Sequence, residues 1–173
     1  MITMITGGAR SGKSRYAQEE ALRLSGHPLY VATARRYKDD EEFGARIARH
    51  EAERDGRWET IEEQTAVSRL PLAGRVVVVD CVTLWLTNFF SRHGYETEPS
   101  LREFKEEIDR LRETDARLFI ITNEIGMGVH AETAIGRRFT DLQGWANQYL
   151  AACAAEVVLL VSGLPLTVKR AAL

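Results

Sequence analysis

Residues 7–14 read Gly-Gly-Ala-Arg-Ser-Gly-Lys-Ser and lie between an apolar, β-prone segment at 1–6 and a helix-prone segment at 14–24. The pattern Gly-x-x-x-x-Gly-Lys-Ser between a strand and a helix is typical of a phosphate-binding loop. Its glycines let backbone N–H groups turn toward phosphate oxygens, its lysine brings a positive charge to the outer phosphates, and its serine hydroxyl suits Mg²⁺. The alternative, a glycine turn that binds nothing, is disfavoured by the order of strand, loop and helix. The predicted phosphate-binding residues are Gly7, Gly8, Ala9, Arg10, Ser11, Gly12, Lys13 and Ser14.

Apolar runs alternate with helix-prone runs along the rest of the chain. The predicted strands cover residues 29–33, 76–80, 118–123 and 157–161, with weaker strands at 58–62 and 166–169. The predicted helices cover residues 39–54, 82–90, 101–113 and 138–155. The polar loop through Gly94 and Pro99 is the best candidate for a mobile segment. Such alternation predicts one α/β domain, residues 1–173, with an open, mainly parallel sheet, helices on both faces and an antiparallel C-terminal edge.

The composition excludes several classes of protein. The chain carries 23 Lys and Arg residues against 25 Asp and Glu, and its net charge of −2 lacks the basic surface that binds nucleic acid. No apolar run approaches the roughly 18 residues that a membrane span needs. Cys81 and Cys153 each lie in an apolar segment, which favours buried, reduced thiols over a disulfide. These observations predict a cytoplasmic protein without a membrane span.

Polar residues stand at or just beyond the predicted strand ends. Ser14, Thr33, Asp80 and Asn123 all occupy such positions. Because ligands of open parallel sheets bind at the carboxyl ends of the strands, these side chains are expected to meet along one edge. Asp80 then becomes a second Mg²⁺ ligand beside Ser14. The alternative for Asp80 is an N-cap of the helix that starts at Val82, and both roles could coexist.

Three further positions are less informative. Asn123 and Glu124 open a glycine-containing segment, and they could satisfy loop backbone or contact a phosphate or a water molecule. Glu62 ends a weak strand, and nothing in the residues alone favours a role for it.

Arg46, His50 and Arg54 are spaced four and four on the charged helix predicted at 39–54, so they form one stripe. Neighbouring cations disfavour imidazolium and attract phosphate oxygens, which suits a histidine nucleophile at phosphorus. The alternative is a solvated helix face with an incidental histidine. Spacing alone favours that alternative.

Taken together, the motifs resemble the bifunctional adenosylcobinamide kinase/adenosylcobinamide-phosphate guanylyltransferase of cobalamin biosynthesis. The resemblance spans nearly the whole chain, in order. The motifs that carry it are Gly7–Ser14, Arg46-Ile-x-x-His50 with Arg54, Trp58 and Thr60, Asp80–Asn88, Thr122–Gly128, Gly136–Leu142, Ala146–Gln148 and Ser162–Pro165.

The resemblance implies a P-loop NTPase with a RecA-like sheet, a homotrimer and two reactions. One phosphorylates the aminopropanol hydroxyl of adenosylcobinamide with ATP or GTP in the presence of Mg²⁺. The other moves GMP from GTP, through a guanylylated histidine, onto adenosylcobinamide phosphate. Two alternatives remain open: a monofunctional P-loop kinase acting on a small molecule, and a nucleotide-switched binding or motor module.

The resemblance also assigns roles to residues. His50 becomes the GMP-carrying nucleophile, and Lys13 acts in catalysis. Arg49 and Asp55 depart from the residues expected beside this motif, which leaves His50 as the only candidate nucleophile in its segment. The implied nucleotide contacts outside the glycine-rich loop are Val31, Ala32, Thr33, Glu51, Ala52, Glu53, Arg54, Glu62 and Asp80.

Overall fold

The computed structural model describes residues 1–35, 44, 54–128 and 130–170. The charged helix predicted at 39–54 therefore lies almost entirely outside the described residues. Four of the expected site residues, His50, Glu51, Ala52 and Glu53, lie outside them as well.

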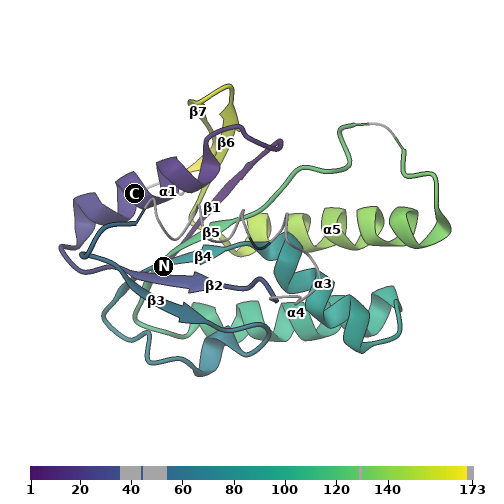
Figure 1. Ribbon diagram of the computed structural model, residues 1–173, viewed down its shortest axis with the longest axis horizontal. Coiled ribbons are helices and arrows are strands. Elements are labelled where there is room, and N and C mark those ends of the chain that lie inside the picture. The colour runs from purple at the N-terminus through teal and green to yellow at the C-terminus, as the bar shows by residue number, and fades with distance from the viewer. Residues whose placement is uncertain (36–43, 45–53, 129, 171–173) are drawn as a thin grey trace.

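The described residues form one sheet of seven strands in the order β3-β2-β4-β5-β1-β6-β7 (Figure 1). The strands are β1 (Ile2–Gly7), β2 (Leu29–Ala32), β3 (Glu59–Glu62), β4 (Val76–Asp80), β5 (Arg117–Ile121), β6 (Glu156–Val161) and β7 (Leu164–Arg170). All neighbours pair in parallel except β6 and β7, which are antiparallel. The predicted antiparallel C-terminal edge is thus confirmed, and it is longer than expected.

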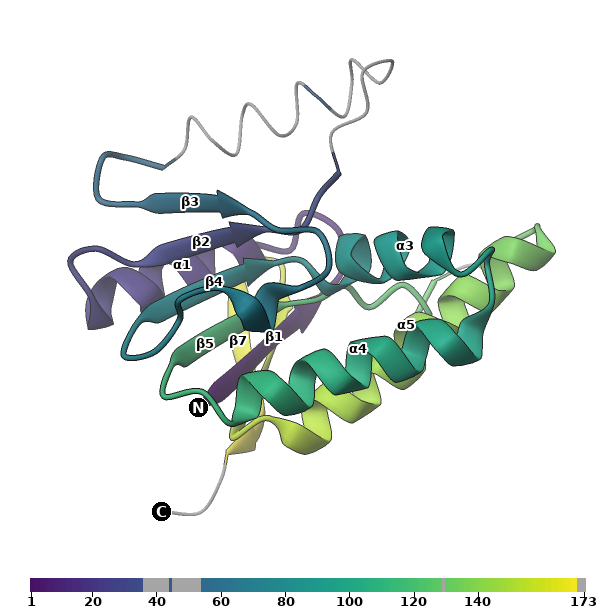
Figure 2. The same ribbon diagram turned by 90° about the horizontal axis from the view of Figure 1, so that it is seen from below.

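Helices cover both faces of this sheet. They are α1 (Lys13–Leu24), α3 (Val82–Arg92), α4 (Thr97–Arg112) and α5 (Ala134–Cys153), with a short 3₁₀ helix η1 (Val67–Arg69). Helix α1 lies on one face, whereas α3, α4 and α5 pack together on the other (Figures 1 and 2). Within the described part of the chain, every helix is too short or too polar to span a bilayer.

Alternate strand residues face the two helical layers. In β4, Val77 and Val79 pack into the core beneath α3, α4 and α5, whereas Val78 packs with Ala17 and Ala21 of α1. All five side chains are fully buried. Because successive side chains of a strand point to opposite faces, a sheet covered on both faces needs unbroken apolar runs. The predicted fold class, a mainly parallel α/β sheet with helices on both faces, is confirmed.

Two helices begin earlier than the sequence indicates. Helix α4 starts at Thr97 rather than at residue 101, so the expectation of a mobile loop is wrong for residues 97–100. Pro99 is the third residue of this helix, where its missing N–H costs no intrahelical bond. Helix α5 starts at Ala134 because the Thr133 hydroxyl oxygen caps it, accepting the Gly136 N–H at 3.0 Å.

The larger core predicts a clear difference between two leucine substitutions. Leu111 is fully buried at the end of α4, whereas Leu24 is 55% exposed at the end of α1. Leu111→Ala should lower the free energy of unfolding by about 2–5 kcal/mol, because it removes buried methyl groups and leaves a cavity. Leu24→Ala, the matched control, should change it by no more than about 0.5 kcal/mol. Urea unfolding followed by circular dichroism measures both, and equal losses would contradict the placement of this core.

Candidate active site

The glycine-rich loop connects β1 to α1 through a tight, strained backbone. Gly7 and Gly12 have positive φ angles of 147° and 94°, and Arg10 lies at 56°. A Cβ atom on Gly7 would stand 2.5 Å from the carbonyl oxygen of Leu160 and 2.8 Å from Ser11 Oγ. Any side chain at Gly7 would therefore force β6 away from the loop.

Lys13 and the N-terminus of α1 gather positive charge at this loop. The side chain of Lys13 is 7% exposed, and its Nζ donates to the carbonyl oxygen of Gly8 at 2.6 Å and to Ser11 Oγ at 3.4 Å. Helix α1 begins at Lys13 and has no acidic residue in its first turn. Free N–H groups and the positive end of the helix dipole attract anions. This loop can therefore bind phosphate groups, as the sequence predicts.

Asp80, at the end of β4, meets the loop. Its Oδ2 accepts a hydrogen bond from Ser14 Oγ at 2.9 Å and another from the Tyr30 hydroxyl at 2.6 Å. Cys81 is the N-cap residue of α3, and among the described residues its side chain makes no cap hydrogen bond, so the N-cap role considered for Asp80 is wrong. A carboxylate and a hydroxyl are hard oxygen ligands, which fit Mg²⁺ when phosphate and water oxygens complete its shell.

Tyr30 contacts both Asp80 and Arg54, the last residue of the charged helix predicted at 39–54. Burial, with the adjacent Asp80 carboxylate, raises the pKa of Tyr30 well above its usual range, so its hydroxyl stays protonated and donates to Asp80. The Arg54 guanidinium lies 4.0 Å from the centre of the Tyr30 ring. Trp58 packs edge-on against the same ring, with centroids 6.0 Å apart. Arg54, an expected nucleotide contact, therefore lies beside the residue that holds Asp80.

Thr33 fastens the end of β2 to the end of β4. Its Oγ1 donates to the carbonyl oxygen of Cys81 at 2.8 Å and accepts the Cys81 N–H at 2.9 Å. Among the expected contacts in this strand end, Val31 and Thr33 are fully buried, whereas Ala32 is half-buried. Burial raises the pKa of the Cys81 thiol to about 12, so the thiol stays protonated. Both cysteines are free, as predicted, but only Cys81 is buried; Cys153 is half-buried, so the expectation of a buried thiol is wrong for it.

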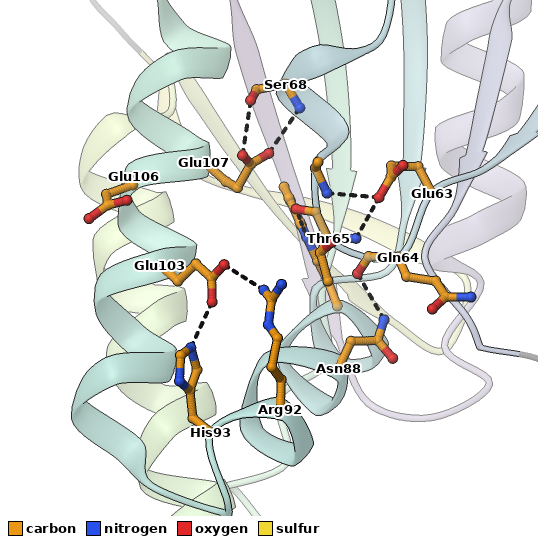
Figure 3. Close-up of polar contacts among 12 residues, drawn as sticks. Glu63, Gln64, Thr65, Ser68, Asn88, Arg92, His93, Glu103, Glu106 and Glu107 are labelled. Atoms are coloured by element: carbon orange, nitrogen blue, oxygen red, sulfur yellow. Dashed lines mark hydrogen bonds and ion pairs between the residues drawn. The ribbon is translucent and has the colours of Figure 1, made fainter.

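The loop after Glu62 is fixed from two sides, as Figure 3 shows. Asn88 Nδ2, from α3, donates to the carbonyl oxygens of Thr33 at 2.8 Å and of Gln64 at 2.9 Å. Glu63 Oε1 accepts the N–H groups of Thr65 and Ala66, both at 2.8 Å.

Farther along the same loop, Ser68 donates to the Glu107 carboxylate of α4 through its N–H and its hydroxyl (Figure 3), each at 2.9 Å. Glu62, exposed at the end of β3, pairs with Ala32 at the end of β2.

The residues after β5 complete this edge of the sheet. Asn123 Nδ2 donates to Thr83 Oγ1 of α3 at 2.9 Å, and Glu124 Oε1 accepts the Thr6 hydroxyl at 2.9 Å. Both side chains are half-buried. The prediction that polar residues at the strand ends lie along one edge of the sheet is therefore confirmed for the glycine-rich loop, Thr33, Asp80 and Asn123.

Sequence reasoning missed two residues of this edge. Tyr30 and Thr6 belong to no motif, and both bind carboxylates far away in the chain, at separations of 50 and 118 residues. A usable signal existed for Tyr30, because a tyrosine inside a buried strand needs a partner for its hydroxyl.

Comparisons with known proteins agree over nearly the whole chain. The family model CobU, described as cobinamide kinase / cobinamide phosphate guanyltransferase, matches residues 3–168. The bifunctional adenosylcobalamin biosynthesis protein CobP of Pseudomonas aeruginosa is 39% identical, covering 98% of both chains. The corresponding CobU proteins of Escherichia coli and Salmonella typhimurium are 36% and 35% identical, covering 98% of this chain and 100% of theirs.

A solved structure, the flagellar accessory protein FlaH of Methanocaldococcus jannaschii, aligns with 98% of this chain and 78% of its own. Its TM-score of 0.47 and identity of 13% are too low to bear on fold or function. The match to the family model over residues 3–168 and the identities above 30% are decisive. The chain belongs to the cobinamide kinase / cobinamide phosphate guanyltransferase family.

Proposed function

We propose that this protein phosphorylates adenosylcobinamide with ATP or GTP and then transfers GMP from GTP to adenosylcobinamide phosphate, giving adenosylcobinamide-GDP for cobalamin synthesis. The observation that carries the proposal is the family match over residues 3–168. The contact between Ser14 and Asp80, beside a glycine-rich loop, supports it independently, because both reactions start from a nucleoside triphosphate.

In the kinase step, the loop of residues 7–14 would hold the triphosphate, with Lys13 beside the outer phosphates. Ser14 and Asp80 would hold Mg²⁺, which offsets negative charge on the phosphate oxygens. The substrate hydroxyl then attacks the γ-phosphorus in line, and the nucleoside diphosphate leaves. The protein contributes chiefly position and charge in such a reaction.

In the guanylyl transfer, a nitrogen of His50 would attack the α-phosphorus of GTP and release pyrophosphate. The phosphate of adenosylcobinamide phosphate would then take the GMP from His50. Arg54, the described residue that follows His50 most closely, supports this assignment, because its guanidinium lies against Tyr30 and hence near Asp80. We also assign nucleotide contacts in this step to Glu51, Ala52, Glu53 and Glu62.

The proposal includes a homotrimer in the cytoplasm. Leu164, Leu166 and Val168 are 72%, 58% and 62% exposed along β7, and such an apolar row offers a surface for contact between subunits. Light scattering at several protein concentrations measures the assembly state.

To test the whole proposal, the protein is incubated with adenosylcobinamide, ATP, GTP and Mg²⁺, and the products are followed over time. Mass spectrometry should detect adenosylcobinamide phosphate first and adenosylcobinamide-GDP later. Accumulation of the phosphate alone would favour the monofunctional kinase. Nucleotide hydrolysis at the same rate with and without adenosylcobinamide would favour the switched module.

Removing the Asp80 charge tests the metal assignment. Asp80→Asn should raise the Mg²⁺ concentration for half-maximal kinase activity by at least about tenfold, because the amide binds Mg²⁺ far more weakly. A Mg²⁺ titration of the kinase rate, with the unfolding midpoint measured in parallel, checks this. Asp109→Asn is a matched control, since the Asp109 carboxylate also accepts a tyrosine hydroxyl, that of Tyr149, at 2.6 Å but on α4. An unchanged Mg²⁺ dependence in Asp80→Asn would refute the assignment.

A further inference from the structure

The carboxylate of Glu124 follows β5, whose two neighbouring strands lead to the metal ligand and to the phosphate loop. Strand β5 lies between β4, which ends at Asp80, and β1, which leads into the loop. The Glu124 N–H donates to the carbonyl oxygen of Gly7 at 3.2 Å, so the chain after β5 runs beside the first residue of the loop. Glu124 is therefore next to the place where the triphosphate would bind.

The orientation of this carboxylate is fixed by two donors that share one oxygen. Oε1 accepts the Thr6 hydroxyl at 2.9 Å and Asn147 Nδ2 at 3.0 Å. Oε2 makes no hydrogen bond to any residue that the structure describes. The side chain is half-buried, so Oε2 is the atom available to a ligand.

The donors are themselves held by a buried network. Asn147 Oδ1 accepts the Thr122 hydroxyl at 2.6 Å and Gln143 Nε2 at 3.0 Å. Thr6, Thr122, Gln143 and Asn147 are all at most 6% exposed. A buried polar network of this kind fixes its members in one arrangement. Strand β1, helix α5 and the residue that follows β5 thus position a single carboxylate.

The two hydrogen bonds that hold the Glu124 side chain do not require it to be charged. A glutamine could accept the same two hydrogen bonds through its amide oxygen. A carboxylate beside a phosphate-binding loop repels the phosphates, so its presence costs nucleotide affinity unless the charge is used. Accepting a proton from a substrate is a function that the Glu124 carboxylate can perform and a glutamine amide cannot.

We propose that Glu124 is the general base of the kinase step, an inference that rests on the proposed function. Its Oε2 takes the proton of the substrate hydroxyl as the alcohol oxygen forms a bond to the γ-phosphorus. The bond between that phosphorus and the β,γ-bridging oxygen breaks, and the nucleoside diphosphate leaves with the electron pair. The proton later passes from Glu124 to solvent.

This role separates the two reactions of the protein. The kinase nucleophile is a hydroxyl, which must lose its proton as it attacks. The nucleophiles of guanylyl transfer are a neutral imidazole nitrogen and a phosphate anion, and each attacks through a lone pair that carries no proton. Glu124 should therefore be needed for phosphorylation and dispensable for guanylyl transfer.

The test is Glu124→Gln, which keeps one oxygen for Thr6 and Asn147 and replaces Oε2 by an amide that takes no proton. Its kcat for phosphorylation of adenosylcobinamide should fall by about 10²–10⁴-fold, while KM for the nucleotide stays the same or falls, because the repelling charge is removed. Transfer of GMP from GTP to supplied adenosylcobinamide phosphate should continue at the rate of the unchanged protein.

Two more variants keep the test decisive. Glu124→Asp retains a carboxylate and should recover part of the kinase rate. Glu156→Gln makes the same chemical change at the start of β6, on the opposite edge of the sheet, where Glu156 pairs with Arg170; both reactions should be unaffected.

An unchanged kinase rate in Glu124→Gln overturns the proposal, and so do equal losses in both reactions, which would make Glu124 a nucleotide-positioning residue. If Glu124→Gln lowers the unfolding midpoint, the deciding comparison is with Glu124→Asp. A kinase rate of Glu124→Asp no higher than that of Glu124→Gln then overturns the proposal as well. Absence of kinase activity in the unchanged protein would instead contradict the proposed function.

Discussion

Lys13→Ala should lower kcat/KM by about 10²–10³-fold in both reactions, the broadest loss expected from any single substitution in this chain. The Lys13 ammonium lies over the glycine-rich loop, where its Nζ donates to the carbonyl oxygen of Gly8 at 2.6 Å. When a triphosphate binds, this charge stabilises the phosphate oxygens as the bond to the leaving group breaks. Initial rates of phosphorylation and of GMP transfer, at several nucleotide concentrations, measure the effect.

Lys169→Ala provides the control for this experiment. Its Nζ also donates to backbone carbonyl oxygens, those of Ala151 and Ala152 at 2.8 and 3.0 Å, but from β7. It should retain both activities. Full phosphorylation by Lys13→Ala at saturating nucleotide would show that the loop was assigned wrongly.

His50→Asn should abolish the covalent attachment of GMP while sparing phosphorylation of adenosylcobinamide. The unchanged protein, incubated with GTP and Mg²⁺, should gain one GMP per chain and release pyrophosphate. A bond between phosphorus and a histidine nitrogen is lost in acid and survives alkali, unlike an ester of serine or threonine. Intact-protein mass spectrometry before and after acid treatment detects the adduct and identifies the type of bond.

His130→Asn serves as the comparison, because His130 is an exposed histidine close in sequence to Glu124. This variant should still acquire GMP and transfer it to adenosylcobinamide phosphate. Label on a peptide containing His130, or an adduct that persists in His50→Asn, would refute the assignment of the nucleophile.

The sequence predicts the strands well because their apolar runs are continuous. Within the run Val76–Val79, Val77 to Val79 are buried on both faces of the sheet, and a polar residue, Asp80, ends the run. A short, β-branched run of this kind is typical of a central parallel strand, so the predicted bounds of β4 match the observed ones. The glycine-rich loop is equally clear, because each residue type in it meets a distinct chemical demand.

Helix starts are predicted less well because proline and glycine are tolerated in a first turn. Pro99 and Gly136 both suggest loops, yet each lies in the first turn of its helix, α4 and α5. A proline or glycine in the sequence is compatible with a loop and with the first turn of a helix, and the packing of the folded chain decides between the two.

The polar network of the candidate site is beyond sequence reasoning for a different reason. Thr6 and Glu124 pair only because β1 and β5 are neighbours, and the strand order is a property of the whole fold. The roles of His50 and of residues 51–53 stay predictions, because those residues lie outside the described part of the chain.

The central position of β1 bears on how the protein is made. This strand leaves the ribosome well before its partners, β5 and β6, which begin at Arg117 and Glu156. At about 5–20 residues per second, the 110 residues from Gly7 to Arg117 take roughly 6–22 s to synthesise. During that time an apolar strand has neither neighbour, and exposed strand edges promote aggregation. Soluble yield during overproduction should therefore depend on chaperone supply early in translation.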